Sequence, residues 1–273
     1  MSPSLPITEM AMPQPIFFAH ANGFPSATYG KLFAALAPDY SVSHVACQGH
    51  DPRFPVDDNW HGLVDELLHH VQGQPAPVWG VGHSLGGVLH LHAAMRRPDL
   101  YRGVIMLDSP VFTRIERWLI RGAKQIGLID RITPAGRTLG RRASFPDPET
   151  ARRYFASKAL FQGFDPECLE AYLEHGLAQA AQGWHLRFDP ATEIGIYRSV
   201  PHELPMPGRQ MQVPVAMIGG RQSRVVRPRH ALAIRAMPKG EYHTVPGGHM
   251  FPLERPVDTA SLIKGLCDRW SQA

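Results

Sequence analysis

The sequence lacks the features that mark several special classes of protein. No run approaches the roughly 20 consecutive apolar residues that a membrane-spanning helix needs. The N-terminal segment has neither the basic start nor the apolar run of a secretory signal. Cysteine is scarce, and its positions are widely spaced and form no CxxC pair: Cys47, Cys168 and Cys267. We therefore expect a cytoplasmic protein without stable membrane insertion, a disulfide framework or a metal site.

Charge of one sign is not in large excess either. Lys and Arg number 28 against 24 Asp and Glu, a difference of +4 that is too small to indicate nucleic acid as a partner. The chain carries no Gly-rich phosphate loop and no dinucleotide fingerprint, so we expect no cofactor. Apolar residues make up 44% of the 273 residues, which is enough to form a packed core.

Two stretches of the chain, residues 1–110 and 208–273, alternate short apolar runs with helical patterns. The expected strands are 15–19, 41–46, 77–81, 103–107, 213–218 and 242–245. The expected helices are 29–36, 60–71, 85–95, 229–236 and 257–270. Strands that alternate with helices predict an α/β core in which helices cover both faces of a parallel sheet.

The middle of the chain, residues 111–207, shows no strand pattern. Its expected helices are 113–127, 148–161, 166–179 and 190–197. Open α/β sheets bind ligands at the carboxyl ends of their strands. We therefore predict that this segment is a helical cap over that edge of the sheet.

A nucleophile motif lies where an expected strand meets an expected helix. Gly82-His83-Ser84-Leu85-Gly86 matches G-x-S-x-G, and this strand–turn–helix setting is the one that a nucleophile elbow requires. Such a turn is tight enough to demand small residues two positions before and after the serine. It would expose the hydroxyl of Ser84 and direct the backbone N–H of Leu85 at a developing oxyanion. The alternative is a Gly-rich turn with a surface serine.

Together with three other motifs, this elbow resembles the α/β-hydrolase superfamily, in its cap-bearing serine hydrolase branch. The other motifs are His20-Ala-Asn-Gly-Phe-Pro25, Gln48-Gly-His50 and Gly247-Gly-His-Met250. The resemblance implies an α/β-hydrolase fold with a mostly parallel sheet of about six to seven strands and a helical cap. About fourteen residues precede the first expected strand, so we expect six strands, or seven with one short extra strand before them.

The resemblance also implies roles for residues in two loops. The loop that begins at His20 supplies the second oxyanion N–H in the family, and we carry that role to Asn22, with Phe24 as the alternative. We expect His20 and His50 to brace their loops. In the family's chain order the catalytic histidine comes last, after the final strand. This position makes His249 the predicted general base, with a surface loop histidine as the competing interpretation, and leaves His83 as a packing residue.

The acid of the predicted triad departs from the common pattern. Most members place it after the penultimate strand, but residues 219–226 contain no Asp or Glu, and Ser223 occupies the expected position. Asp108 ends the strand that follows the elbow helix, a position that part of the haloalkane dehalogenases uses. We predict Asp108 as the acid that orients His249. The alternatives are a turn-forming Asp108 and a dyad assisted by Ser223.

A serine nucleophile favours acyl transfer. We predict that the protein hydrolyses a small or medium carboxylic ester, a small-molecule acyl substrate, through an acyl-enzyme on Ser84. A carbon–carbon bond hydrolase would use the same triad, and a non-catalytic ligand-binding protein on this fold is the rival from another class.

The segment 113–142 is rich in arginine and carries an apolar stripe at helical spacing, which comprises Ile115, Trp118, Leu119, Gly122 and Ile126. Two interpretations arise: a basic amphipathic surface for anionic substrates or a membrane, or an ordinary cap helix whose stripe packs on the core. The second is favoured. Four aromatic residues could line a pocket, although core positions are the favoured interpretation: Phe161, Phe164, Trp184 and Tyr197.

Overall fold

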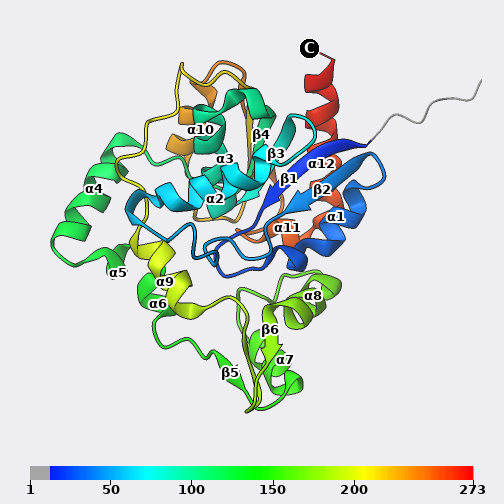
Figure 1. Ribbon diagram of the computed structural model, residues 1–273, viewed down its shortest axis with the longest axis vertical. Coiled ribbons are helices and arrows are strands. Elements are labelled where there is room, and N and C mark those ends of the chain that lie inside the picture. The colour runs from blue at the N-terminus through cyan, green and yellow to red at the C-terminus, as the bar shows by residue number, and fades with distance from the viewer. Residues whose placement is uncertain (1–12, 273) are drawn as a thin grey trace, which may run out of the picture.

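The computed structural model describes residues 13–272, and its centre is a parallel β-sheet (Figure 1). The six strands lie in the order β2-β1-β3-β4-β8-β9. They are β1 (Gln14–Ala19), β2 (Tyr40–His44), β3 (Val78–His83), β4 (Tyr101–Leu107), β8 (Val215–Gly220) and β9 (Gly240–Val245). The predicted α/β fold is confirmed, and each of the six expected strands is present. The short extra strand would fall on residues before 13, outside the described part of the chain.

Helices cover both faces of this sheet because every central strand is apolar on both sides. On one face Phe18 and Ile105 pack in a cluster with α1 (Gly30–Leu36) and α12 (Pro256–Ser271). On the other face Phe17 and Val104 pack with α2 (His61–Gln72), α3 (Leu85–Arg96) and α10 (Pro228–Arg235). Neighbouring residues of one strand therefore serve opposite faces, as the two-residue period of a strand requires.

The chain between β4 and β8 forms an insertion outside the sheet, which we call the β4–β8 insertion (residues 111–207). Figure 1 shows most of it beyond one edge of the sheet, with α4 reaching away from the body. Its helices are α4 (Arg114–Gln125), α5 (Ile129–Ile132), α6 (Ala135–Thr138), α7 (Pro148–Ala156), α8 (Pro166–Gly176) and α9 (Pro190–Arg198). The last three begin alike, because an aspartate side chain accepts a backbone N–H of the first turn and a proline follows it.

The expectation that the insertion holds no strands is wrong. The strands β5 (Ser144–Phe145), β6 (Leu177–Gln179) and β7 (Trp184–Leu186) form an antiparallel sheet in the order β5-β7-β6. Strands of two or three residues are too short to show an alternating pattern in the sequence. Residues 177–179 were expected to end a helix, but the chain leaves α8 at Gly176 and turns back at Gly183, whose φ is +78°.

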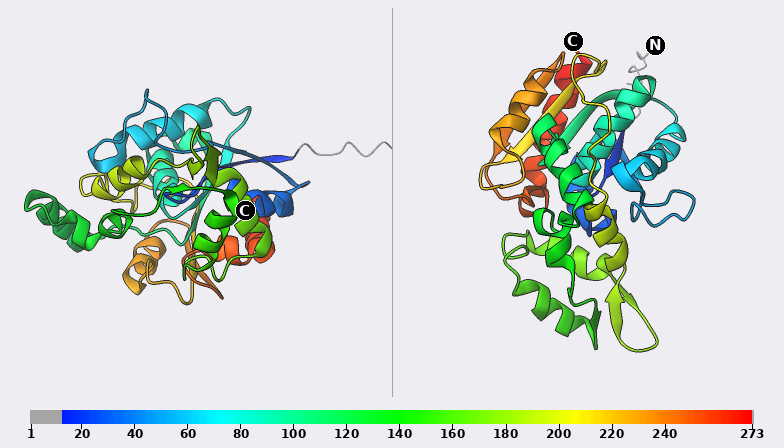
Figure 2. Two further views of the ribbon diagram at one scale, coloured as in Figure 1. Left: turned by 90° about the horizontal axis from the view of Figure 1, so that it is seen from below. Right: turned by 90° about the vertical axis from the view of Figure 1, so that its left-hand side faces the viewer.

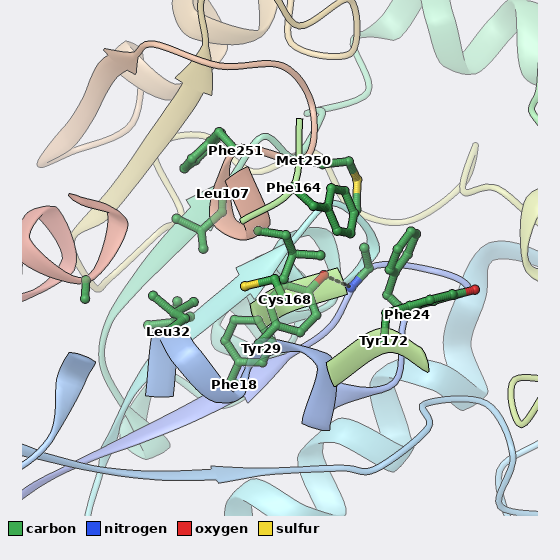
Figure 3. Close-up of a cluster of buried hydrophobic side chains, with 14 of the residues drawn as sticks. Phe18, Phe24, Tyr29, Leu32, Leu107, Phe164, Cys168, Tyr172, Met250 and Phe251 are labelled. Carbon is green, nitrogen blue, oxygen red and sulfur yellow. Dashed lines mark hydrogen bonds between the residues drawn. The ribbon is translucent and has the colours of Figure 1, made fainter. Parts of the chain in front are cut away.

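Aromatic side chains join the insertion to the core. Phe24 lies with its ring centre 5.2 Å from that of Tyr172 and 5.9 Å from that of Phe161. Figure 3 shows Phe24, Phe164 and Tyr172 beside core residues such as Tyr29. The core positions favoured for Phe161 and Phe164 are confirmed. No helix within residues 13–272 has both the length and the apolar character to cross a membrane.

Candidate active site

Ser84 occupies a strained turn between β3 and α3. Its φ of 52° and ψ of −111° are rarely adopted by a residue with a side chain, and such strain concentrates at functional sites. The predicted need for small neighbours is confirmed: a Cβ on Gly82 would lie 2.2 Å from the Gly86 carbonyl carbon, and one on Gly86 would lie 2.1 Å from the Ala19 oxygen. The backbone N–H of Ser84 donates to the Leu107 carbonyl at 2.9 Å, which ties the turn to β4.

Asp108 and His249 lie in direct contact. The Nδ1 of His249 is 2.7 Å from Oδ2 of Asp108, a carboxylate that is fully buried at the end of β4. The other carboxylate oxygen accepts the backbone N–H of Gly220 at 2.9 Å. Because a carboxylate only accepts, Nδ1 donates to it, and in the neutral tautomer Nε2 of His249 is the proton acceptor.

Ser223, at the position where most members of the superfamily hold the acid, contacts the same carboxylate. Its hydroxyl donates to Oδ2 of Asp108 and accepts the backbone N–H of Val225 at 3.1 Å. The tips of β4 and β8 are neighbours in the sheet, with Leu107 opposite Ile218. This adjacency lets a side chain from either strand reach the same histidine.

Ser84 and His249 line one pocket, together with Leu85, Asn22 and Met250. No direct hydrogen bond joins the side chains of Ser84 and His249 in the structure, although both residues are described. In enzymes without bound substrate this contact is often long and tightens when substrate binds. The structure therefore brings Asp108 to His249 by a hydrogen bond, and Ser84 and His249 line the same pocket.

His83 does more than pack, contrary to the prediction. Its Nε2 is 2.9 Å from the backbone oxygen of His249, and its Nδ1 is 2.7 Å from the hydroxyl of Tyr29. The hydroxyl of Tyr29 also accepts the backbone N–H of Ala21 at 3.3 Å. Burial holds the pKa of His83 well below its usual value, so the ring is neutral. Nothing local in the sequence signals these contacts between distant residues.

The structure narrows the choice of the second oxyanion donor. The backbone N–H of Phe24 donates to the Ala21 oxygen at 3.1 Å, so the alternative donor is already engaged. Asn22 is buried beside the pocket, and its side-chain amide donates to the backbone oxygen of Glu193 at 3.0 Å. The backbone N–H of Asn22 and the second N–H of its side-chain amide remain the candidates for the predicted role.

His20 and His50 brace loops, as expected. The Nε2 of His20 accepts the backbone N–H of Gln48 at 2.7 Å, and its Nδ1 donates to the Ala21 oxygen at 2.8 Å. Burial lowers the pKa of His20 to about 4, so the ring stays neutral. His50 accepts the backbone N–H of Asp189 at 3.0 Å and links the core to the insertion. Within residues 13–272, no group of His, Cys, Asp or Glu side chains is arranged to hold a metal ion.

A buried ion pair that the sequence did not predict lies at the pocket wall. Arg141 Nη1 contacts Glu193 Oε2 at 2.6 Å, and Arg141 Nη2 donates to the Tyr172 hydroxyl at 2.7 Å. Burial raises the pKa of Glu193 despite the nearby guanidinium. The sequence did not reveal this pair because its partners lie 52 residues apart. Charged residues in a helical pattern usually indicate a solvated face instead of a buried pair.

The pocket has a volume of about 1580 Å³, and residues of α4 form part of its wall. The favoured interpretation of the α4 stripe, that it packs on the core, is wrong. Trp118 is 74% exposed, Leu119 is 52% exposed and Ile126 is 69% exposed, and all three line the pocket. The helix rests on the body through other positions, because Ile120 and Ala123 are its buried residues. Tyr197 and Phe161 also line the pocket, whereas Trp184 packs beside the core.

A family model and several relatives match this chain. The model of the Alpha/beta hydrolase family matches residues 16–262. A pimeloyl-[acyl-carrier protein] methyl ester esterase of Shewanella woodyi is 31% identical over 113 residues, which are 41% of this chain and 43% of that protein. A type I acyl-CoA thioesterase of Penicillium brevicompactum is 28% identical over 173 residues, 57% of this chain and 38% of that protein. The chain thus spans about two fifths of the length of these relatives.

Among solved structures, the E-2-(acetamidomethylene)succinate hydrolase superposes with a TM-score of 0.76. It is 21% identical in sequence, and the match covers 93% of this chain and 91% of that one. A thioesterase domain from the curacin biosynthetic pathway gives a TM-score of 0.66 at 17% identity, covering 92% and 90% of the two chains. Identities this low establish a shared fold alone.

Proposed function

The chain belongs to the alpha/beta hydrolase family, and from that premise we propose that it hydrolyses a carboxylic ester through an acyl-enzyme on Ser84. The relatives named as esterases and thioesterases support an enzyme that acts on esters. The observation that carries the proposal is the 2.7 Å contact between His249 and the buried Asp108, in a pocket that also holds the strained Ser84.

In the first half of the reaction, the Oγ of Ser84 attacks the ester carbonyl carbon while Nε2 of His249 takes the hydroxyl proton. Asp108 stabilises the resulting imidazolium and keeps Nδ1 protonated. The negative oxygen of the tetrahedral intermediate accepts hydrogen bonds from the backbone N–H groups of Leu85 and Asn22. When the intermediate collapses, the alcohol leaves with the proton from His249.

In the second half, His249 removes a proton from water, and the oxygen of that water attacks the acyl carbon. The bond to Ser84 breaks, the proton returns to the serine oxygen, and the carboxylic acid is released. The two halves use the same base and the same oxyanion donors, so one set of residues serves both.

The β4–β8 insertion supplies much of the pocket wall in this proposal. We propose that residues 1–110 and 208–273 form the hydrolase core and that residues 111–207 form a cap. Phe161, Tyr197 and Glu193 of the insertion line the pocket beside Ser84, which supports this division.

Thioester hydrolysis is a second candidate, favoured by the relative that is named an acyl-CoA thioesterase. A thioester carbonyl would meet the same nucleophile, base and oxyanion donors. Paired assays of butyryl p-nitrophenyl ester and a butyryl thioester would rank the two bonds by kcat/KM.

The test of the proposal combines labelling with turnover. A fluorophosphonate should label the wild type on Ser84, and p-nitrophenyl butyrate should be hydrolysed; Ser84→Ala should lose both. Ser157→Ala is the matched control, because Ser157 is exposed in the insertion and bonds only the Tyr154 oxygen. Labelling without ester turnover would favour a carbon–carbon bond hydrolase. An unlabelled wild type would favour a ligand-binding protein.

A further inference from the structure

The helix α4 presents an apolar face to the pocket instead of burying it. Large exposed apolar side chains that gather on one face of a soluble protein mark a binding surface. The face consists of Trp118, Leu119, Gly122 and Ile126, which follow one another at helical spacing and all line the pocket that contains Ser84. Figure 2 shows α4 projecting from the body of the molecule in the view from below.

Contacts at both ends of α4 fix the direction of this face. At the start, Thr113 and Glu116 form a capping box, and Glu116 also accepts hydrogen bonds from Arg229 and His230 of α10. Near the end, Lys124 donates to the Val200 oxygen at 2.8 Å. Because the helix is already held in place, binding of a ligand would cost no conformational entropy for ordering it.

The size of the pocket exceeds what a small ester needs. Its volume of about 1580 Å³ is above the roughly 300–1000 Å³ of usual small-molecule sites. A short acyl group at Ser84 would leave the apolar face of α4 in water. A longer chain would cover this face. Removing the apolar surfaces of the chain and of α4 from water would then favour binding.

We infer that the face formed by Trp118, Leu119 and Ile126 binds the apolar tail of a long or bulky acyl chain whose carbonyl lies at Ser84. This inference rests on the proposed function. It names the substrate class as esters of medium-to-long apolar acids, and it assigns chain-length selectivity to α4.

Ile115 separates this inference from docking on a lipid surface. It belongs to the same apolar stripe and is 72% exposed, similar to Trp118, but it does not line the pocket. An acyl chain in the pocket would contact Trp118 and not Ile115. A lipid surface would contact both residues alike.

The first experiment measures kcat/KM for p-nitrophenyl esters from acetyl to decanoyl. Each added CH₂ group that becomes buried should raise kcat/KM of the wild type by about fourfold until the face is covered. In Trp118→Ala the ratio of decanoyl to acetyl kcat/KM should fall by about tenfold or more, whereas Ile115→Ala should keep the wild-type ratio. A wild type with no preference for longer chains, or an equal loss in both variants, would overturn the inference.

The second experiment follows binding without turnover. Trp60 and Trp79 are buried and Trp184 and Trp270 are half-buried, so the exposed indole of Trp118 should report ligand by fluorescence. Methyl decanoate should shift the emission of the Ser84→Ala variant to the blue, and the shift should vanish when Trp118→Phe is added. Vesicles of phosphatidylcholine and phosphatidylglycerol should give no shift; a vesicle shift that Ile115→Ala weakens would instead assign the face to lipid.

Failure of this inference can be told from failure of the proposed function. If Ser84 is labelled by a fluorophosphonate and the acetyl ester is hydrolysed, but chain length has no effect, the proposed function stands and the assignment of α4 falls. If Ser84 is not labelled and no ester is hydrolysed, the proposed function itself falls.

Discussion

The Nε2 of His83 lies 2.9 Å from the backbone oxygen of His249, and 166 residues separate the two in sequence. Because a carbonyl oxygen can only accept, Nε2 of His83 donates to it. The Nδ1 of His83 then accepts a hydrogen bond from the hydroxyl of Tyr29. Tyr29 in turn accepts the backbone N–H of Ala21, next to the predicted oxyanion donor Asn22. One buried chain of hydrogen bonds therefore links the loop of the base to the loop of the oxyanion donor.

The first prediction concerns this chain. Tyr29→Phe removes the hydroxyl and leaves Nδ1 of His83 buried without a donor, which costs about 1 to 3 kcal/mol of folding free energy. If the chain holds His249 in place, kcat should also fall by about tenfold while KM changes little, as steady-state kinetics on a soluble ester would measure.

A matched variant controls for lost stability. Tyr40→Phe removes a hydroxyl that donates to Asp268 at 2.7 Å, on a contact with α12 that does not involve the pocket. It should lower the unfolding free energy without lowering kcat. If both variants leave kcat at the wild-type value, the chain has no positioning role.

The second prediction concerns the acid. Asp108→Asn retains an oxygen for the backbone N–H of Gly220 but presents no charge to His249, so the fold should persist while kcat falls by orders of magnitude. In serine proteases the same change costs about 10⁴. Circular dichroism would check the fold, and near wild-type turnover would refute the assignment of Asp108.

The third prediction moves the acid to the neighbouring strand. Ser223 already donates to the Asp108 oxygen that contacts His249. In the double variant Asp108→Asn/Ser223→Asp, a carboxylate from the tip of β8 should therefore reach Nδ1 of His249. We expect kcat to rise at least tenfold above that of Asp108→Asn alone. Ser223→Asn in the same background is the control, and an equal rise there would contradict the idea that the new charge is responsible.

The sequence predicted the features that depend on short-range pattern. The strands of the main sheet, the turn at Ser84 and the small residues around it all follow from local spacing. Asp108 followed from the family resemblance, because residues 219–226 hold no acid and part of the superfamily places the acid at the end of the strand after the elbow helix. The contacts of His83, the pair of Arg141 with Glu193 and the exposure of Trp118 depend on which distant segments meet, and no local pattern encodes that.

The last prediction concerns pH and a buried acid outside the pocket. Glu66 is 1% exposed on α2 and accepts hydrogen bonds from the Gly49 N–H at 2.7 Å and the Gln48 amide at 2.8 Å. Burial outweighs these bonds and raises its pKa from 4.5 to about 7. Between pH 4.5 and about pH 7, Glu66 is therefore protonated in the folded protein and ionised in the unfolded chain. Its contribution to stability is complete below pH 4.5 and is lost as the pH rises through 7.

Glu66→Gln removes this titration and keeps an oxygen for the same two donors. The difference in unfolding free energy between the wild type and Glu66→Gln should therefore shift by about 3 kcal/mol against the wild type as the pH rises from 4.5 to 8. Urea unfolding at several pH values would measure the shift. Asp65→Asn is the matched control, since Asp65 lies on the same helix as Glu66, is half-exposed and pairs with Arg96 of α3. No shift in Glu66→Gln would show that Glu66 ionises normally in the folded protein, and its carboxylate would then stabilise the Gln48–Gly49 loop at neutral pH. A shift as large in Asp65→Asn would show that the pH dependence is not specific to Glu66.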